Sequence, residues 1–168
     1  MVIASGTYTG TGSSQTITLS YSPDFLWVWG PDGAGSYIRT SSFTGTNSMR
    51  VDNILVTDAI TALGATGFTV GTSSGVNASG KVFIYFAIEN TGADDVAVGS
   101  YTGNATDNRN IVISPAFQPD LVAIFNTPFN CLWRTSAMPA GDNSKWFDQI
   151  IQTDRIQAFN ASITNLRE

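Results

Sequence analysis

The side chains that could carry chemistry in this chain are mainly carboxylates, because its 168 residues include no histidine. Without histidine, Ser-His-Asp catalysis, Cys-His catalysis and ordinary zinc sites are excluded. Asp24, Asp52 and Asp58 could in principle supply the carboxylate pair that a glycosidase needs. The sequence contains no nucleophile elbow, phosphate-binding loop or dinucleotide fingerprint.

A structural role suits these carboxylates better, because they recur in the second half of the chain together with an arginine. Arg39 recurs as Arg134, each inside an apolar stretch. The three aspartates recur as Asp120, Asp148 and Asp154. A guanidinium that points inward needs partners. We therefore predict structural ion pairs in each half, of Arg39 with Asp24, Asp52 or Asp58 and of Arg134 with Asp120, Asp148 or Asp154, and no catalytic residue.

Other polar and aromatic groups are weaker candidates for a ligand site. Asp94, Asp95, Asn104, Asp107 and Asn108 offer oxygen ligands, but their spacing matches no calcium loop, and we interpret them as turn residues. We predict no metal and no cofactor.

The tryptophans could form a sugar-binding platform. Trp27, Trp29 and Trp133 lie in apolar segments and are predicted to pack in the core. Trp146 is the best candidate for an exposed aromatic side chain that contacts a ligand, so a glycan remains a possible partner. Cys131, the single cysteine, is predicted to be a small buried apolar residue.

Charge and composition exclude several classes of partner. The net charge is −5, charged residues make up only 12% of the chain, and its six arginines are scattered. Without a basic stripe to neutralise phosphates, we expect no nucleic-acid binding. No apolar run approaches the length of a membrane span, and no signal peptide is visible, so we expect no membrane association. A neutral polar surface of Ser, Thr, Asn and Gly is compatible with extensive protein contacts.

An internal repeat determines the expected architecture. Gly6-Thr-Tyr-Thr-Gly10 recurs as Gly99-Ser-Tyr-Thr-Gly103, and further matched patches follow in the same order. Short apolar segments alternate with turn residues, which is typical of a β-sandwich. The sequence therefore predicts an all-β chain of two tandem, related β-sandwich-like units, residues 1–92 and 93–168.

The second unit is predicted to be truncated. Val82 to Ile88 reads as a central strand of the first unit, and the second unit has no counterpart of it. The missing strand would expose apolar core and unpaired backbone groups. We expect another chain, or the first unit, to complete the second one, unless its smaller sheet closes on itself.

Several of these motifs resemble a β domain of tailed-bacteriophage virion structural proteins. The resemblance is carried by four segments, of which the last precedes an aromatic strand. They are Gly99–Asn104, Ile111–Val122, Gly67–Gly71 and Val76–Gly80. A more distant similarity, through Phe117–Val122, is to the H-type lectin sandwich.

The resemblance implies a non-enzymatic component of the virion surface, which we expect to be a capsid decoration (cement) protein. Its partners would be copies of itself, with a trimer favoured, and major capsid or tail proteins. The alternative is a tail-appendage or lectin-like carbohydrate-binding protein for host adhesion.

Overall fold

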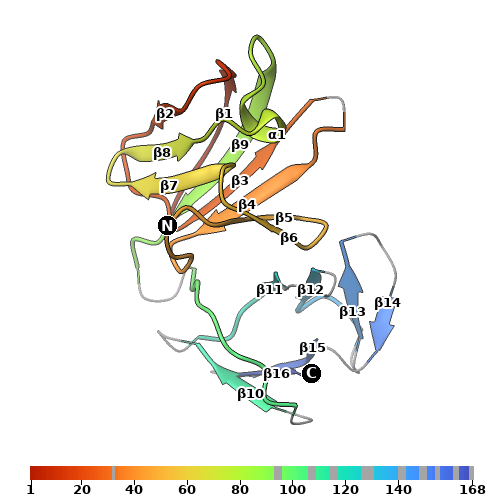
Figure 1. Cartoon of the computed structure of the whole chain (residues 1–168). Coiled ribbons are helices and arrows are strands. Elements are labelled where there is room, and N and C mark those ends of the chain that lie inside the picture. The colour runs from red at the N-terminus through yellow and green to blue at the C-terminus, as the bar shows by residue number, and fades with distance from the viewer. Residues whose placement is uncertain are drawn as a thin grey trace. The chain divides into compact units, whose positions relative to one another are not determined.

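The computed structural model describes residues 1–31, 33–92, 96–105, 109–113, 117–125, 131–139, 143–147, 151–153, 156–160 and 163–166. The fold is nearly all β, with 48% of residues in strands and 3% in helix, so the predicted all-β class is confirmed. The chain divides into two compact units, Met1–Gly99 and Ser100–Glu168 (Figure 1). The division follows Gly99, whereas the sequence predicted it after Gly92.

Unit 1 is built from two antiparallel sheets. The larger sheet has the spatial order β1 (Val2–Thr9), β9 (Val82–Glu89), β3 (Phe25–Trp29), β4 (Ser36–Thr40), β5 (Ser48–Arg50) and β6 (Ile54–Val56). The smaller sheet has the order β2 (Gln15–Thr18), β8 (Gly67–Val70) and β7 (Ile60–Gly64). A one-turn helix, α1 (Ser74–Asn77), precedes β9.

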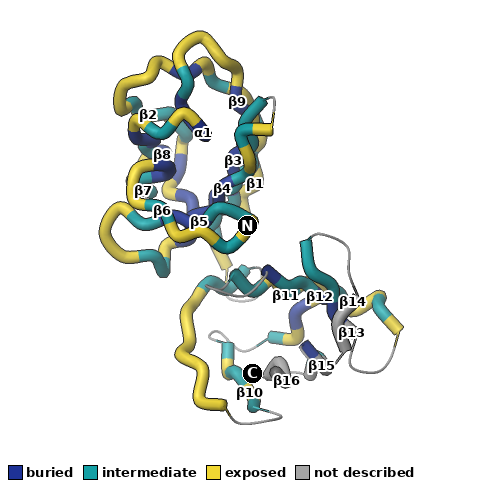
Figure 2. The backbone as a smooth tube through the Cα atoms, turned by 45° about the vertical axis from the view of Figure 1, so that its right-hand side comes forward, coloured by how far each residue is buried: buried dark blue, intermediate teal, exposed yellow. Residues whose placement is uncertain are grey.

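The core of unit 1 lies between these two sheets. Strand alternation turns every second residue of β3 and β9 toward the smaller sheet, so Leu26, Val28 and Phe83 are fully buried. They meet Phe68 and Val70 of β8 in one apolar cluster. In Figure 2 the buried stretches of this unit lie on its facing strands.

The polar side chain of Asn77 in α1 is fully buried and has its hydrogen bonds satisfied. Its carboxamide donates to the carbonyls of Ser13 at 2.7 Å and Gly71 at 2.6 Å. Its oxygen accepts from the Thr11 amide at 2.9 Å and from Gln15 at 2.7 Å. Asn77 thereby joins the β1–β2 loop to the end of β8.

Unit 2 also contains two antiparallel sheets among its described residues. One has the order β11 (Leu121–Ile124), β12 (Leu132–Thr135), β13 (Asn143–Trp146) and β14 (Ile151–Thr153). The other has the order β10 (Arg109–Val112), β16 (Ile163–Leu166) and β15 (Ile156–Asn160). The first order parallels β3-β4-β5-β6, and the second parallels β2-β8-β7.

Individual hydrogen bonds also match between the units. The Ser41 amide donates to the Asp24 carbonyl at 2.8 Å, and the Ser136 amide donates to the Asp120 carbonyl at 2.9 Å. Both serine hydroxyls donate to the carboxylate of the same aspartate. These shared contacts are what a duplicated unit would contain, while the duplication itself stays a prediction.

A second matched bond lies where each smaller sheet approaches its larger one. The amide of Ile60 donates to the hydroxyl of Ser48 at 3.2 Å. The amide of Ile156 donates to the hydroxyl of Ser144 at 3.5 Å. All four residues are fully buried, so the same polar contact lies inside both units.

Candidate functional site: the outer face of the large sheet

The most unusual surface of unit 1 is the side of its large sheet that faces away from the core. Strand alternation places eight large apolar side chains of three neighbouring strands on this side. They are Ile3 of β1, Val82, Ile84, Phe86 and Ile88 of β9, and Phe25, Trp27 and Trp29 of β3. We call this set the outer apolar face.

The antiparallel register arranges these side chains in rows across the strands. One row joins Ile3, Ile88 and Phe25. The next row joins Ser5, Phe86 and Trp27, and the third joins Thr7, Ile84 and Trp29.

Consecutive rows are also in contact along β3. The rings of Trp27 and Trp29 stack with their centroids 4.5 Å apart. The outer apolar face is therefore one continuous surface and not a set of scattered side chains.

Water still reaches this surface. Ile3, Val82 and Ile84 are 52%, 55% and 54% exposed, and the other five side chains are half-buried. None of the eight is charged. Isolated exposed apolar residues are normal, but a contiguous patch on a soluble protein marks an interaction surface.

The prediction that Trp27 and Trp29 pack in the core is wrong. Leu26 and Val28 face the core, and the two tryptophans lie on the outer apolar face. Because all five residues of β3 are apolar, the sequence had no polar alternation to show which set points inward.

Arg39 is buried as predicted for an inward arginine, but its predicted ion pair is wrong. The guanidinium donates to backbone carbonyls, those of Gly45 at 2.7 Å, Ile60 at 3.4 Å and Asn47. A longer bond of 3.5 Å reaches the Phe43 carbonyl. Burial lowers the pKa of Arg39. The turn after β4 folds back over this side chain, so its carbonyls occupy the places that a carboxylate would take.

The three aspartates of unit 1 bind other partners. Asp52 accepts two hydrogen bonds of 2.6 Å from Arg50, and this contact lowers the pKa of Asp52. Asp58 accepts from the hydroxyl and the amide of Thr72, which lowers its pKa. Asp24 accepts from the hydroxyl of Ser41 and from the amide of Asn90. Each carboxylate therefore closes a local turn or strand end.

In unit 2 the corresponding arginine is buried as well. Arg134 on β12 donates to the Pro139 carbonyl at 3.4 Å and lies 5.8 Å from the ring centre of Phe159. Asp120 accepts from Ser136 at 2.7 Å. Asp148 and Asp154 lie outside the described residues, so a carboxylate partner of Arg134 stays a prediction.

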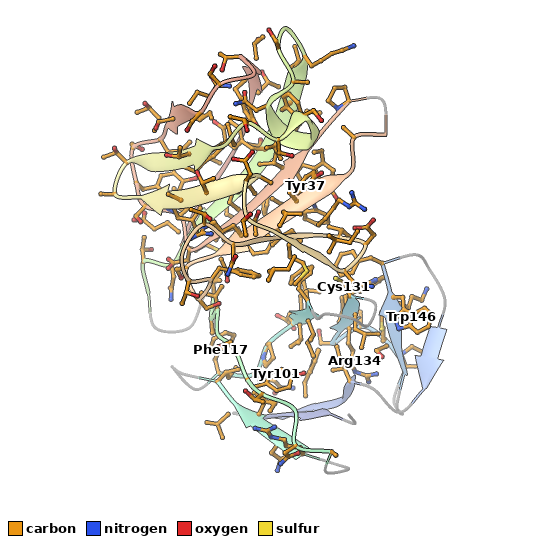
Figure 3. The ribbon with its side chains drawn as sticks, viewed as in Figure 1. Tyr37, Tyr101, Phe117, Cys131, Arg134 and Trp146 are labelled. Atoms are coloured by element: carbon orange, nitrogen blue, oxygen red, sulfur yellow. The ribbon has the colours of Figure 1, made fainter. Side chains whose placement is uncertain are left out.

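The structure adds little support for a ligand site at the tryptophans and the cysteine of unit 2. Trp146 lies half-buried on β13, paired with Leu132 of β12, and is not a fully exposed platform (Figure 3). Trp133 is half-buried on β12. Cys131 is 1% exposed, which confirms the prediction of a buried thiol.

The oxygen-bearing turn residues are mostly outside the described part of the chain. Asn104 is exposed, and Asp94, Asp95, Asp107 and Asn108 fall in the gaps of the description. Within the part of the chain that the structure describes, no three His, Cys, Asp or Glu side chains gather as a metal site would require.

No helix among the described residues is long and apolar enough to cross a membrane. Neither a protein-family model, nor a curated protein, nor a solved structure matches this chain.

Proposed function

We propose that this chain is a non-enzymatic structural protein that acts through protein–protein contacts, and that the outer apolar face buries itself against further copies of the chain. The observation that carries the proposal is the contiguous outer apolar face, with eight uncharged apolar side chains on one side of the sheet. Covering such a face removes apolar surface from water, which is the main driving force of association.

The size of this driving force indicates the kind of assembly. Full burial of one large apolar side chain is worth about 1.5–3 kcal/mol. Because the eight side chains are already partly covered, the face offers on the order of 8–10 kcal/mol. Association itself costs about 4–15 kcal/mol. A single pair of faces is therefore marginal, and stable burial requires several copies held together, as in an ordered particle.

Charge is compatible with contact between copies. The chain carries a net charge of −5, so two copies repel each other at long range. The outer apolar face contains no carboxylate that would have to be desolvated at the contact.

The proposed location is the surface of a tailed-phage particle, as a capsid decoration protein, with a tail-surface component as the alternative. This placement is supported by the turn and strand motifs described above, among them Gly99–Asn104 and Ile111–Val122. Copy number in purified particles, measured by mass spectrometry, separates the two locations: hundreds of copies indicate the capsid and a few or tens indicate the tail.

The self-association step is tested by sedimentation velocity of the full chain over a wide concentration range. We expect association that grows with concentration in the parent and is shifted to the monomer by Ile84→Lys, which places a charge in the middle of the rows. The matched control is Val112→Lys, because Val112 of β10 is a β-branched strand residue that is 71% exposed. A parent that stays monomeric, or two variants that behave alike, would refute the proposal.

A further inference from the structure

The large sheet of unit 1 has two edge strands, β1 and β6, and only β6 is protected against pairing with another chain. β6 is three residues long, and Arg50 and Asp52 form an ion pair directly before it. Short strands and charges at a sheet edge discourage contact between chains. β1 is eight residues long, contains no charged residue and no proline, and pairs with β9 from Val2 to Thr9 without a bulge.

The backbone groups on the open edge of β1 belong to Ile3, Ser5 and Thr7. At the end of the β1–β9 ladder, the Gly10 amide donates to the Lys81 carbonyl at 2.8 Å. Hydrogen-bonded pairs alternate along an antiparallel ladder, so the even-numbered residues of β1 are the ones bonded to β9. The odd-numbered residues point their amides and carbonyls the other way. On that side, no strand pairs with β1 in the part of the chain that the structure describes.

Thr9, the last odd-numbered residue of β1, is partly occupied. The carboxamide of Gln15 donates to the Thr9 carbonyl at 3.1 Å. The fully open segment therefore runs from Ile3 to Thr7 and is centred on Ser5, and all three of these residues are exposed. A segment with such a centre can pair with an identical segment about a two-fold axis.

We propose that β1 of one copy pairs antiparallel with β1 of a second copy, about a two-fold axis at Ser5. In this register Ser5 lies opposite Ser5 of the second copy, and Ile3 lies opposite Thr7 of the second copy. Each of the three opposed pairs exchanges two backbone hydrogen bonds, so the contact gains about six. The inference rests on the self-association proposed above, because it states how two copies meet.

This pairing would join the outer apolar faces of the two copies. Directly opposed residues of an antiparallel pair place their side chains on the same side of the sheet. The row of Ser5, Phe86 and Trp27 would continue into the same row of the second copy. The row that ends at Ile3 would continue into the row of the second copy that begins at Thr7. Two six-stranded sheets would thus become one sheet with a doubled outer apolar face.

A second copy suits this edge because the open segment is complementary to itself. The register brings no two like charges together, since β1 contains no charged residue. The neighbouring edge strand of the smaller sheet, β2, contains none either. The two opposed Ser5 hydroxyls can also bond across the axis. Because a single outer apolar face gives only a marginal driving force, joining two of them before they bury strengthens the assembly.

The first test is amide hydrogen exchange of the unaltered full chain, followed by NMR at low and high concentration. The amides of Ile3, Ser5 and Thr7 should exchange fast in the dilute protein and slow by about tenfold or more when it associates. The amides of the even-numbered residues of β1 should be slow at both concentrations, because they are bonded to β9. Association that leaves Ile3, Ser5 and Thr7 in fast exchange would overturn the proposal.

Proline variants test the edge without adding a charge. Ser5→Pro removes the central N–H but no bond to β9, and proline is tolerated on an edge strand where its nitrogen faces away from the neighbouring strand. In sedimentation velocity this variant should need about a tenfold higher concentration to associate, which corresponds to about 1.4 kcal/mol. The matched control Ser5→Ala keeps the N–H and should behave like the parent. Thr7→Pro, with Thr7→Val as its control, repeats the test, and urea unfolding checks that each variant keeps the fold.

Cross-linking tests the register. Ser5→Cys should give a covalent dimer with a short bis-maleimide, because the two Cβ atoms would lie about 5.5 Å apart. Thr9→Cys lies on the same side of the sheet but about 27 Å from its equivalent in the second copy, so it should not cross-link. The parent controls for the native Cys131, which is 1% exposed. Cross-linking of Thr9→Cys and not of Ser5→Cys would contradict the register.

The variants also separate this contact from the proposed function. If Ile84→Lys dissociates the chain and Ser5→Pro does not, the copies bury their outer apolar faces without pairing β1, and only this inference fails. If Ser5→Pro dissociates the chain and Ile84→Lys behaves like Val112→Lys, the edge contact stands and the role proposed for the face fails. A parent that stays monomeric at every concentration refutes both.

Discussion

Replacing Arg39 by methionine should destabilise unit 1 by about 3 kcal/mol, because each hydrogen bond from a charged donor contributes about 1.5–3 kcal/mol. Its guanidinium donates to four carbonyls, those of Gly45 and Asn47 and, over 3.4 and 3.5 Å, those of Ile60 and Phe43. The bonds to Gly45 and Asn47 alone give about 3–6 kcal/mol. The lower end applies because the variant no longer has to desolvate a guanidinium and water can reach the carbonyls of the turn.

Two further variants make this prediction specific. Arg50→Met removes an arginine whose partner, Asp52, is exposed, and a surface pair of this kind is worth about 0–1 kcal/mol. Arg39→Lys keeps the charge but offers a single ammonium to several separated carbonyls, so it should fall between the parent and Arg39→Met.

The measurement is urea-induced unfolding of the full chain, with hydrogen exchange assigning the transition to unit 1. If Arg39→Met unfolds at the same urea concentration as the parent, or if Arg50→Met is the more damaging change, the carbonyl contacts of Arg39 do not stabilise the fold and the reasoning is refuted.

Three other predictions concern buried and titrating groups. Asn77→Ala removes four side-chain hydrogen bonds and should lower the free energy of unfolding by about 3–4 kcal/mol. The control Gln15→Ala removes one of these four bonds and should cost about 1 kcal/mol. Equal unfolding midpoints of the two variants would contradict this prediction. The pKa values of Asp52 and Asp58 are lowered in the folded protein, so the unfolded chain binds more protons below its own aspartate pKa of about 3.9. Stability should therefore be fully present above that pH and fall as the pH drops below it, and Asp58→Asn should flatten the fall in an acid titration followed by circular dichroism. Cys131 should resist a thiol reagent in the native protein and react completely in denaturant, whereas immediate labelling of the native protein would show that the thiol is accessible.

The sequence predicted the class of fold because its turn residues and short apolar segments repeat at strand spacing. The strand Val82–Glu89 was recognisable from its aromatic and β-branched run, and it lies between β1 and β3 inside the large sheet. The inward direction of Arg39 was also predictable, since few other arrangements suit an arginine inside an apolar strand.

The exposed site was harder to predict, because the face that a strand turns to solvent depends on its neighbours. In Phe25–Trp29 both sets of alternate residues are apolar, and only the packing of β3 against β8 shows which set lies inside. The partners of Arg39 were missed because backbone carbonyls carry no signal in a sequence. Their position depends on how the turn through Gly45 and Asn47 closes.

The pairing of the first strand of unit 1 with its last has a consequence for folding during synthesis. Val2 lies opposite Glu89, so the sheet cannot close until the whole stretch from β1 to β9 has left the ribosome. Until β9 has been synthesised, no strand links β1 to β3, because β9 lies between them in the sheet. Contacts so distant along the chain slow folding. Each nascent chain therefore passes through a period with an open sheet edge, during which a chaperone or a wrong strand could bind it.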